Sequence, residues 1–162
     1  MLEISDLVMS TNPSYLQTAA DDQVTNYRDW GIPLGRRFRA LKLWCLIREQ
    51  GVLGLQARIR RDLDNAQWLA DQVTAAADWT VVAPVPLQTL CVRHQPDGLD
   101  EQSVDRHTQA WVDRINRSGA AYLTPATLDG RWVARVSIGS ETTQRPDVEA
   151  LWKAMQQSVA VR

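Results

Sequence analysis

The stretch AYLTPATLDGRWVARVSI, residues 121–138, decides how the second half of the chain is expected to fold. Its centre, Asp129-Gly130, is a two-residue pair that favours the tight turn of a β-hairpin. Runs on both sides of this pair are predicted as strands, over residues 121–128 and 131–138. In the second run every other residue from Trp132 onward is apolar, which is typical of a strand with one buried face. The stretch therefore predicts an antiparallel hairpin packed against a core.

Outward from this hairpin, the pattern alternates between helical and extended segments. Helices are predicted over about residues 52–77, over 101–118, and from Pro146 towards the C-terminus. Short strands are predicted over 79–83 and 87–93. From residue 52 the order is therefore α-β-β-α-β-β-α. Two strand pairs with helices packed on one face predict an α+β fold with a small, mainly antiparallel sheet.

The first fifty residues show a different pattern. Residues 10–29 are polar and lack apolar periodicity, which indicates a long loop of the kind that is usually functional or disordered. From Arg36 to about Gln50 apolar residues recur at helical spacing, and Gly51 is expected to end that helix. The sequence thus predicts a loop and a helix that precede the α+β segment.

Charge and composition argue against several classes of partner. The net charge is −1 and the pI is about 6.1, so neither nucleic acid nor an anionic membrane is an expected partner. The N-terminal stretch MLEISDLVMS carries acids where a signal peptide carries positive charge, and no apolar run reaches membrane-spanning length. Cys45 and Cys91 lie in apolar runs and are expected to be buried free thiols. A soluble, cytoplasmic protein is therefore expected.

Motifs for common chemistries are missing from the sequence. The two histidines, His94 and His107, have no cysteine or carboxylate at metal-ligand spacing, so no metal site is expected and both are interpreted as surface residues. There is no phosphate loop, Gly-x-Ser-x-Gly or dinucleotide fingerprint. The only lysines, Lys42 and Lys153, fall in predicted helices, which do not favour a Schiff base.

Four stretches resemble one family of enzymes. YRDWGIPLGRRFRALKLW, residues 27–44, resembles a hallmark of the group II pyridoxal-phosphate decarboxylases, most closely the aromatic-L-amino-acid decarboxylases. The similarity continues through GVLGLQARIRRDLDNAQWLADQV, residues 51–73. NPSYL, residues 12–16, matches the family's mobile catalytic-loop motif, and GAAYLTPATLDGRWVARVSIGS, residues 119–140, resembles its C-terminal hairpin.

The resemblance implies the C-terminal portion of a fold-type I pyridoxal-phosphate (PLP) enzyme. Residues 1–50 would be the end of the large PLP-binding domain, with the mobile catalytic loop at about 11–26, and residues 51–162 the small α+β domain. Family members are considerably longer, and their cofactor-binding lysine follows a histidine upstream of the matching region. Because this sequence has no His-Lys pair, it contains no expected cofactor-binding residue. It is expected to be an incomplete part that is inactive without the remainder of the large domain.

Two residues match functional positions of the family. Tyr15 matches the loop tyrosine whose hydroxyl would deliver a proton to the substrate Cα while the loop excludes water; the alternative is a tyrosine that only packs on the surface. Gly35 matches a position that lines the neighbouring subunit's substrate pocket, where a glycine leaves room for a large ring; a turn or helix-cap glycine is compatible with this. The arginines at 36, 37 and 39 are expected to brace the domain junction rather than touch substrate.

Two functions follow from these implications. The first is the C-terminal part of a PLP-dependent carboxy-lyase, a homodimer when complete, that converts aromatic L-amino acids to amine and CO2. The second is a non-catalytic module, derived from a decarboxylase, that serves dimerisation or another protein interaction.

Overall fold

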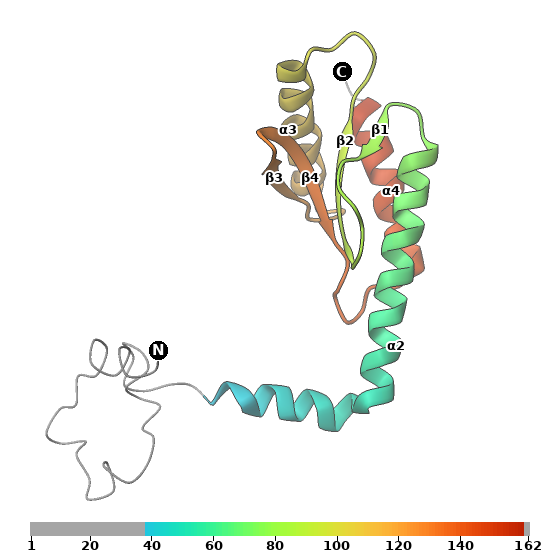
Figure 1. Cartoon of the computed structure of the whole chain (residues 1–162), viewed down its shortest axis with the longest axis vertical. Coiled ribbons are helices and arrows are strands. Elements are labelled where there is room, and N and C mark those ends of the chain that lie inside the picture. Colours follow the sequence, from blue (N-terminus) through green and yellow to red (C-terminus); the bar gives the residue numbers. More distant parts are fainter. Residues whose placement is uncertain (1–37, 161–162) are drawn as a thin grey trace, which may run out of the picture. The chain divides into compact units, whose positions relative to one another are not determined.

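The computed structural model describes residues 38–160, which form the elements α2, β1, β2, α3, β3, β4 and α4 in that order (Figure 1). The chain divides into two compact units, residues 1–49 and residues 50–162. The described part of the first unit, residues 38–49, belongs to α2 apart from Phe38. The second unit holds the rest of α2, the sheet and the other two helices.

The helix α2 (Arg39–Ala75) is interrupted at Gly51, where φ is 65° and ψ is 173°. A positive φ is a conformation that glycine adopts readily and other residues avoid. The expected helix end at Gly51 is therefore confirmed, with a helical segment on each side. Before the break most apolar side chains of α2 are exposed, as at Trp44, which is 59% exposed. Cys45 is exposed as well, so the expectation of a buried thiol is wrong there; Cys91 is partly buried.

After the break, only the later part of α2 is buried. Its buried apolar side chains are Ala66, Leu69, Ala70 and Val73. Val52 and Ile59 recur at helical spacing with Ala66 and Val73 but are exposed. Helical periodicity identifies which residues share a face, but it does not tell whether another element covers that face.

The sheet has four strands: β1 (Trp79–Val81), β2 (Thr89–His94), β3 (Thr124–Leu128) and β4 (Arg131–Ser137). Their order is β1-β2-β4-β3, and every neighbouring pair is antiparallel. Asp129 and Gly130 both have positive φ, 49° and 77°, as a two-residue hairpin turn requires, so the predicted turn is confirmed. Each strand is shorter than predicted, although backbone hydrogen bonds continue just beyond two strand ends: Val82 donates to the carbonyl of Cys91 and Ile138 to that of Gln88, both at 2.9 Å.

The helix α3 (Glu101–Ser118) has a capped structure at both ends. Oδ1 of Asp100 accepts a hydrogen bond from the backbone N–H of Ser103 at 2.8 Å, and Gly119 closes the helix with φ 74°. The last helix, α4 (Arg145–Ala160), carries Pro146 in its first turn, as predicted. These local signals account for where both helices begin and where α3 ends.

One face of the sheet forms the core. Leu90 pairs with Val136 and Val92 with Ala134, so these four side chains share a face. They belong to one buried cluster with side chains of α2, α3 and α4, including the ring of Trp79, which lies 5.4 Å from Trp111 and 5.2 Å from Trp152 between centroids. The predicted α+β fold, with helices on one face of an antiparallel sheet, is confirmed.

Candidate functional site

Both residues that the sequence singled out, Tyr15 and Gly35, lie outside the described residues 38–160. The same is true of the predicted loop 11–26. Of the three arginines expected at the domain junction, only Arg39 is described, at the start of α2, and it is exposed. The polar side chains that the structure describes therefore lie in α2 and in the sheet, helices and loops after it.

The lysines do not provide a cofactor site. Lys42 lies on α2 and Lys153 on α4, and both are exposed. A lysine that binds a cofactor covalently is activated by burial in an apolar pocket or by a neighbouring cation. No other lysine occurs in the chain, so no described residue can hold pyridoxal phosphate covalently in an enclosed setting.

The two histidines form a pair, which corrects their interpretation as isolated surface residues. Nδ1 of His94, at the end of β2, lies 2.8 Å from Nε2 of His107, in the middle of α3, so one ring donates a hydrogen bond to the other. Both rings are partly buried, and His94 lies 4.9 Å from the ring of Trp79 between centroids. The pair joins the sheet to α3 beside the aromatic part of the core.

Burial lowers the pKa of both histidines below the ordinary value of 6.5. For His94 the nearby carboxylate of Asp78 opposes this effect, because a negative charge favours the protonated ring. For His107 the positive charges of His94 and Arg114 act in the same direction as burial. Near neutral pH the pair is therefore mainly uncharged, with one ring donating and the other accepting.

A second polar group lies one residue away, at Arg93. Its side chain is 0% exposed, and its two terminal nitrogens donate to Oε2 of Glu101 at 2.9 Å and to Oδ1 of Asp105 at 2.8 Å. The same oxygen of Asp105 accepts from the backbone N–H of Trp132 at 2.9 Å. This network ties β2, α3 and β4 together and compensates the buried charge.

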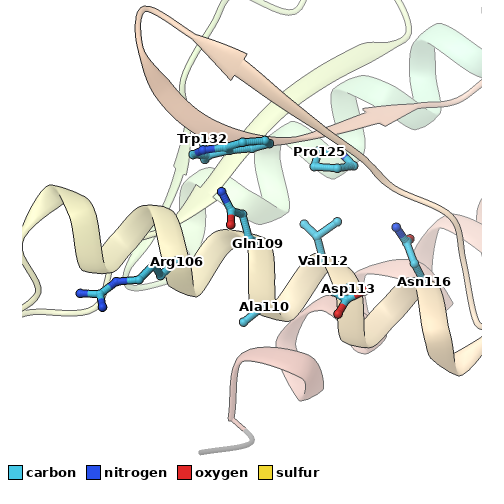
Figure 2. Close-up of a pocket in the computed structure, with 8 residues that line it drawn as sticks. All are labelled: Arg106, Gln109, Ala110, Val112, Asp113, Asn116, Pro125 and Trp132. Atoms are coloured by element: carbon cyan, nitrogen blue, oxygen red, sulfur yellow. The ribbon is translucent and has the colours of Figure 1, made fainter.

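A cavity of about 550 Å³ lies between α3 and the β3–β4 hairpin. Figure 2 shows the rings of Trp132 and Pro125 facing side chains of α3. The facing residues are Gln109, Val112 and Asn116. Asn116 is engaged with both backbone groups of Leu123, which leaves it unavailable to a ligand. The lining holds no histidine, cysteine or lysine, and its one carboxylate, Asp113, is already paired with Arg117 at 2.6 Å.

The second unit also contains a tie between α2 and the segment that follows β4. Arg58 donates to the carbonyl of Gly139 at 3.0 Å, and Arg61 donates to the carbonyl of Glu141 at 3.1 Å. Gln50 donates to the Glu141 carboxylate at 2.9 Å. The two arginines hold backbone in place and Gln50 holds the Glu141 side chain, so the role of all three is structural within this unit.

Among residues 38–160, a metal-binding cluster and a membrane-spanning helix are both absent. No group of three or more histidine, cysteine or acidic side chains is arranged to hold a metal ion. None of the helices described is long and apolar enough to cross a membrane.

Comparison with known proteins identifies the family. Residues 4–95, more than half of the chain, match the family described as "Pyridoxal-dependent decarboxylase conserved domain". The chain belongs to this family. The resemblance that the sequence indicated is thereby confirmed.

Plant enzymes are among its similar relatives. Tryptophan decarboxylase 2 of Oryza sativa subsp. japonica is 34% identical over 149 residues, which are 91% of this chain and 30% of that protein. Phenylacetaldehyde synthase of Arabidopsis thaliana is 33% identical over 156 residues, which are 95% of this chain and 32% of that protein. The chain thus spans about a third of the length of the relatives it matches.

Solved structures of decarboxylases are similar to this chain as well. Oryza sativa TDC with PLP and tryptamine is 31% identical and superposes with a TM-score of 0.82 over 95% of this chain and 33% of that one. Catharanthus roseus tryptophan decarboxylase in complex with L-tryptophan is 30% identical with a TM-score of 0.76, again over 95% of this chain. The likeness therefore extends beyond the 4–95 segment to the small sheet and its helices.

Proposed function

We propose that the chain is part of a PLP-dependent carboxy-lyase that converts aromatic L-amino acids to amine and CO2. The similarity of 91–94% of the chain to proteins named tryptophan and tyrosine decarboxylases carries this proposal. It is supported by a relative solved with tryptamine and another solved with L-tryptophan, which are a product and a substrate of this reaction type.

The cofactor of the complete enzyme would be pyridoxal phosphate. When bound, it supplies the electron sink that loss of CO2 requires. Because Lys42 and Lys153 are both exposed, neither fits covalent attachment. We therefore propose that the covalent site belongs to the part of the relatives that this chain does not match, and that the chain alone is inactive.

The chain's own contribution would come from its first unit. In this proposal residues 1–50 are the end of the large PLP-binding domain, with a mobile catalytic loop at about 11–26, and residues 51–162 are the small domain. The Tyr15 hydroxyl would donate a proton to the substrate Cα while the loop excludes water. Gly35 would leave space for the aromatic ring of the substrate.

Gly35 would act across an interface, because the family position it matches lines the pocket of the neighbouring subunit. We propose that the complete enzyme is a homodimer for this reason. We also propose a cytoplasmic location, which is compatible with two cysteines that are both free.

The test joins this chain to the unmatched upstream part of the rice tryptophan decarboxylase. We expect the fusion to release CO2 and amine from an aromatic amino acid. Tyr15→Phe should lower amine formation about a hundredfold or more while cofactor and substrate still bind. The remaining turnover, with oxygen as oxidant, should shift to aldehyde and ammonia.

Tyr122→Phe is the matched control, because Tyr122 is a described and exposed tyrosine of the small domain. It should leave both rate and product unchanged. Amine formation at the parental rate by the Tyr15→Phe fusion would assign Tyr15 a packing role only. A fusion that binds PLP but releases no CO2 would contradict the carboxy-lyase proposal itself.

A second function is favoured by exposed apolar side chains on one face of α2, which include Leu41, Trp44 and Ile47 at three-residue spacing. A face of this kind is typical of a surface that binds another protein. In this alternative the chain is a non-catalytic module for dimerisation or protein interaction. Native mass spectrometry of the chain alone distinguishes the two: a stable dimer together with an inactive fusion would favour the module.

A further inference from the structure

The pair His94–His107 is a titratable contact between two elements that the proposed reaction does not use. It joins the end of β2 to the middle of α3 through a single hydrogen bond of 2.8 Å between ring nitrogens. The rings lie 5.1 Å apart between centroids, with planes tilted by 43°. We propose that this pair is an acid-sensitive latch, which stays closed when it takes up one proton and opens when it takes up two.

The number of N–H donors that face this contact depends on how many protons the pair carries. A neutral imidazole has one donor nitrogen and one acceptor nitrogen, so two neutral rings can form one N–H···N bond. When the pair takes up one proton, both nitrogens of one ring become donors, while the other ring still accepts. The hydrogen bond is then charge-assisted. A second proton leaves an N–H facing an N–H across 2.8 Å with like charges on both rings. The bond is then lost.

The surrounding charges decide which ring is protonated first. Asp78, which immediately precedes β1, favours charge on His94. Arg114, about two turns after His107 on α3, disfavours charge there, and its Nε donates to the carbonyl of Ser158 in α4 at 2.8 Å. Arg93 beside His94 is already paired with two carboxylates of α3. The first proton therefore belongs on His94, with His107 as acceptor.

The position of the latch determines what its opening would release. His94 pairs in the sheet with Trp79 of β1, and the rings of these two residues are in contact. β1 is an edge strand of three residues and has no other strand beside it in the described sheet. Opening of the latch should therefore loosen β1 and the end of β2 from α3, while the β3–β4 hairpin stays paired.

Nuclear magnetic resonance of the full 162-residue chain tests the latch without any substitution, because the chain has only two histidines. We expect the ring signals to titrate in two coupled steps, both below pH 6.5, with both rings responding to the first step. Rings that titrate independently, each near its ordinary value, would overturn the proposal.

Hydrogen exchange then locates the opening. Protection of the β1 amides should fall by up to about tenfold per pH unit for each proton taken up on opening, while β3–β4 amides remain protected as an internal control. In His107→Gln, whose side chain carries no second charge, this fall should be absent. Loss of protection at β1 and β3–β4 together, or the same fall at β1 in His107→Gln, would each refute a local latch.

Discussion

The network at Arg93 gives the sharpest test of the packing between the sheet and α3. Asp105→Ala removes the carboxylate that lies 2.8 Å from one guanidinium nitrogen and also accepts from the backbone of Trp132. Arg93 would remain fully buried, with Glu101 as its only charged partner in the described part of the chain. That partner is 64% exposed, so water already weakens its attraction.

The expected cost follows from this geometry. Removing one partner of a buried ion pair costs about 3–5 kcal/mol, because the other charge stays buried without compensation. Asp105 is 22% exposed, so water can enter and the lower end of that range applies. Losing the acceptor of the Trp132 amide adds about 1 kcal/mol. We expect Asp105→Ala to lower the free energy of unfolding by about 3–4 kcal/mol.

Two other substitutions in the same network serve as controls. Glu101→Ala removes the exposed partner and should cost less than about 1 kcal/mol. Arg93→Met removes the buried charge itself and leaves an apolar side chain, so its cost should be about 0–2 kcal/mol. The expected order of destabilisation is therefore Asp105→Ala, then Arg93→Met, then Glu101→Ala.

Urea unfolding followed by far-ultraviolet circular dichroism measures all three variants on one scale. The dependence of the unfolding free energy on urea concentration should stay unchanged, which would show that the same surface is exposed on unfolding. The reasoning would be refuted if Asp105→Ala cost no more than Glu101→Ala. It would also be refuted if Arg93→Met proved the most damaging of the three.

Three further outcomes are expected. Gly130→Ala should cost about 1 kcal/mol because an L side chain is strained at φ 77°, whereas Gly139→Ala, at a glycine without positive φ, should be nearly neutral in thermal unfolding. Hydrogen bonds from Ser103 lower the pKa of Asp100 below 3.8 in the folded chain. The stability that this cap contributes should therefore be complete above pH 3.8 and be lost as the pH falls through the pKa of the folded chain. Asp100→Asn should flatten this part of the acid unfolding curve. The chain mixed with pyridoxal phosphate and borohydride should yield no stoichiometric adduct at Lys42 or Lys153, and a single mapped adduct at either would contradict their assignment as ordinary exposed lysines.

Local signals in the sequence were sufficient for much of the small domain. Gly119 and Gly130 occupy positive φ where the sequence requires it, and Pro146 lies in the first turn of α4. These signals act within a few residues, so their effect is independent of the rest of the fold. The break at Gly51 was predicted for the same reason.

Contacts between distant residues were not predictable in this way. The pairing of His94 with His107 depends on the twist of β2 and its distance from α3, which no spacing rule contains. Arg93 had one usable signal, because Glu101 and Asp105 stand four residues apart and so share a face of α3. The exposure of Val52 depends on what covers α2, which periodicity does not report. Tyr15 and Gly35 were singled out only by family resemblance.

The strand order has a consequence for how the chain folds. β2 pairs with β4 rather than with β3. Residues 89–92 therefore cannot complete their pairing until residues 134–137 have left the ribosome, which happens only after α3 has been made. Until then one edge of β2 is open, and an open edge attracts other strands. Contacts of such long sequence separation slow folding, because loop closure must precede them. Newly made chains should therefore pass through a stage that is prone to aggregation, and a holding chaperone would protect them during synthesis.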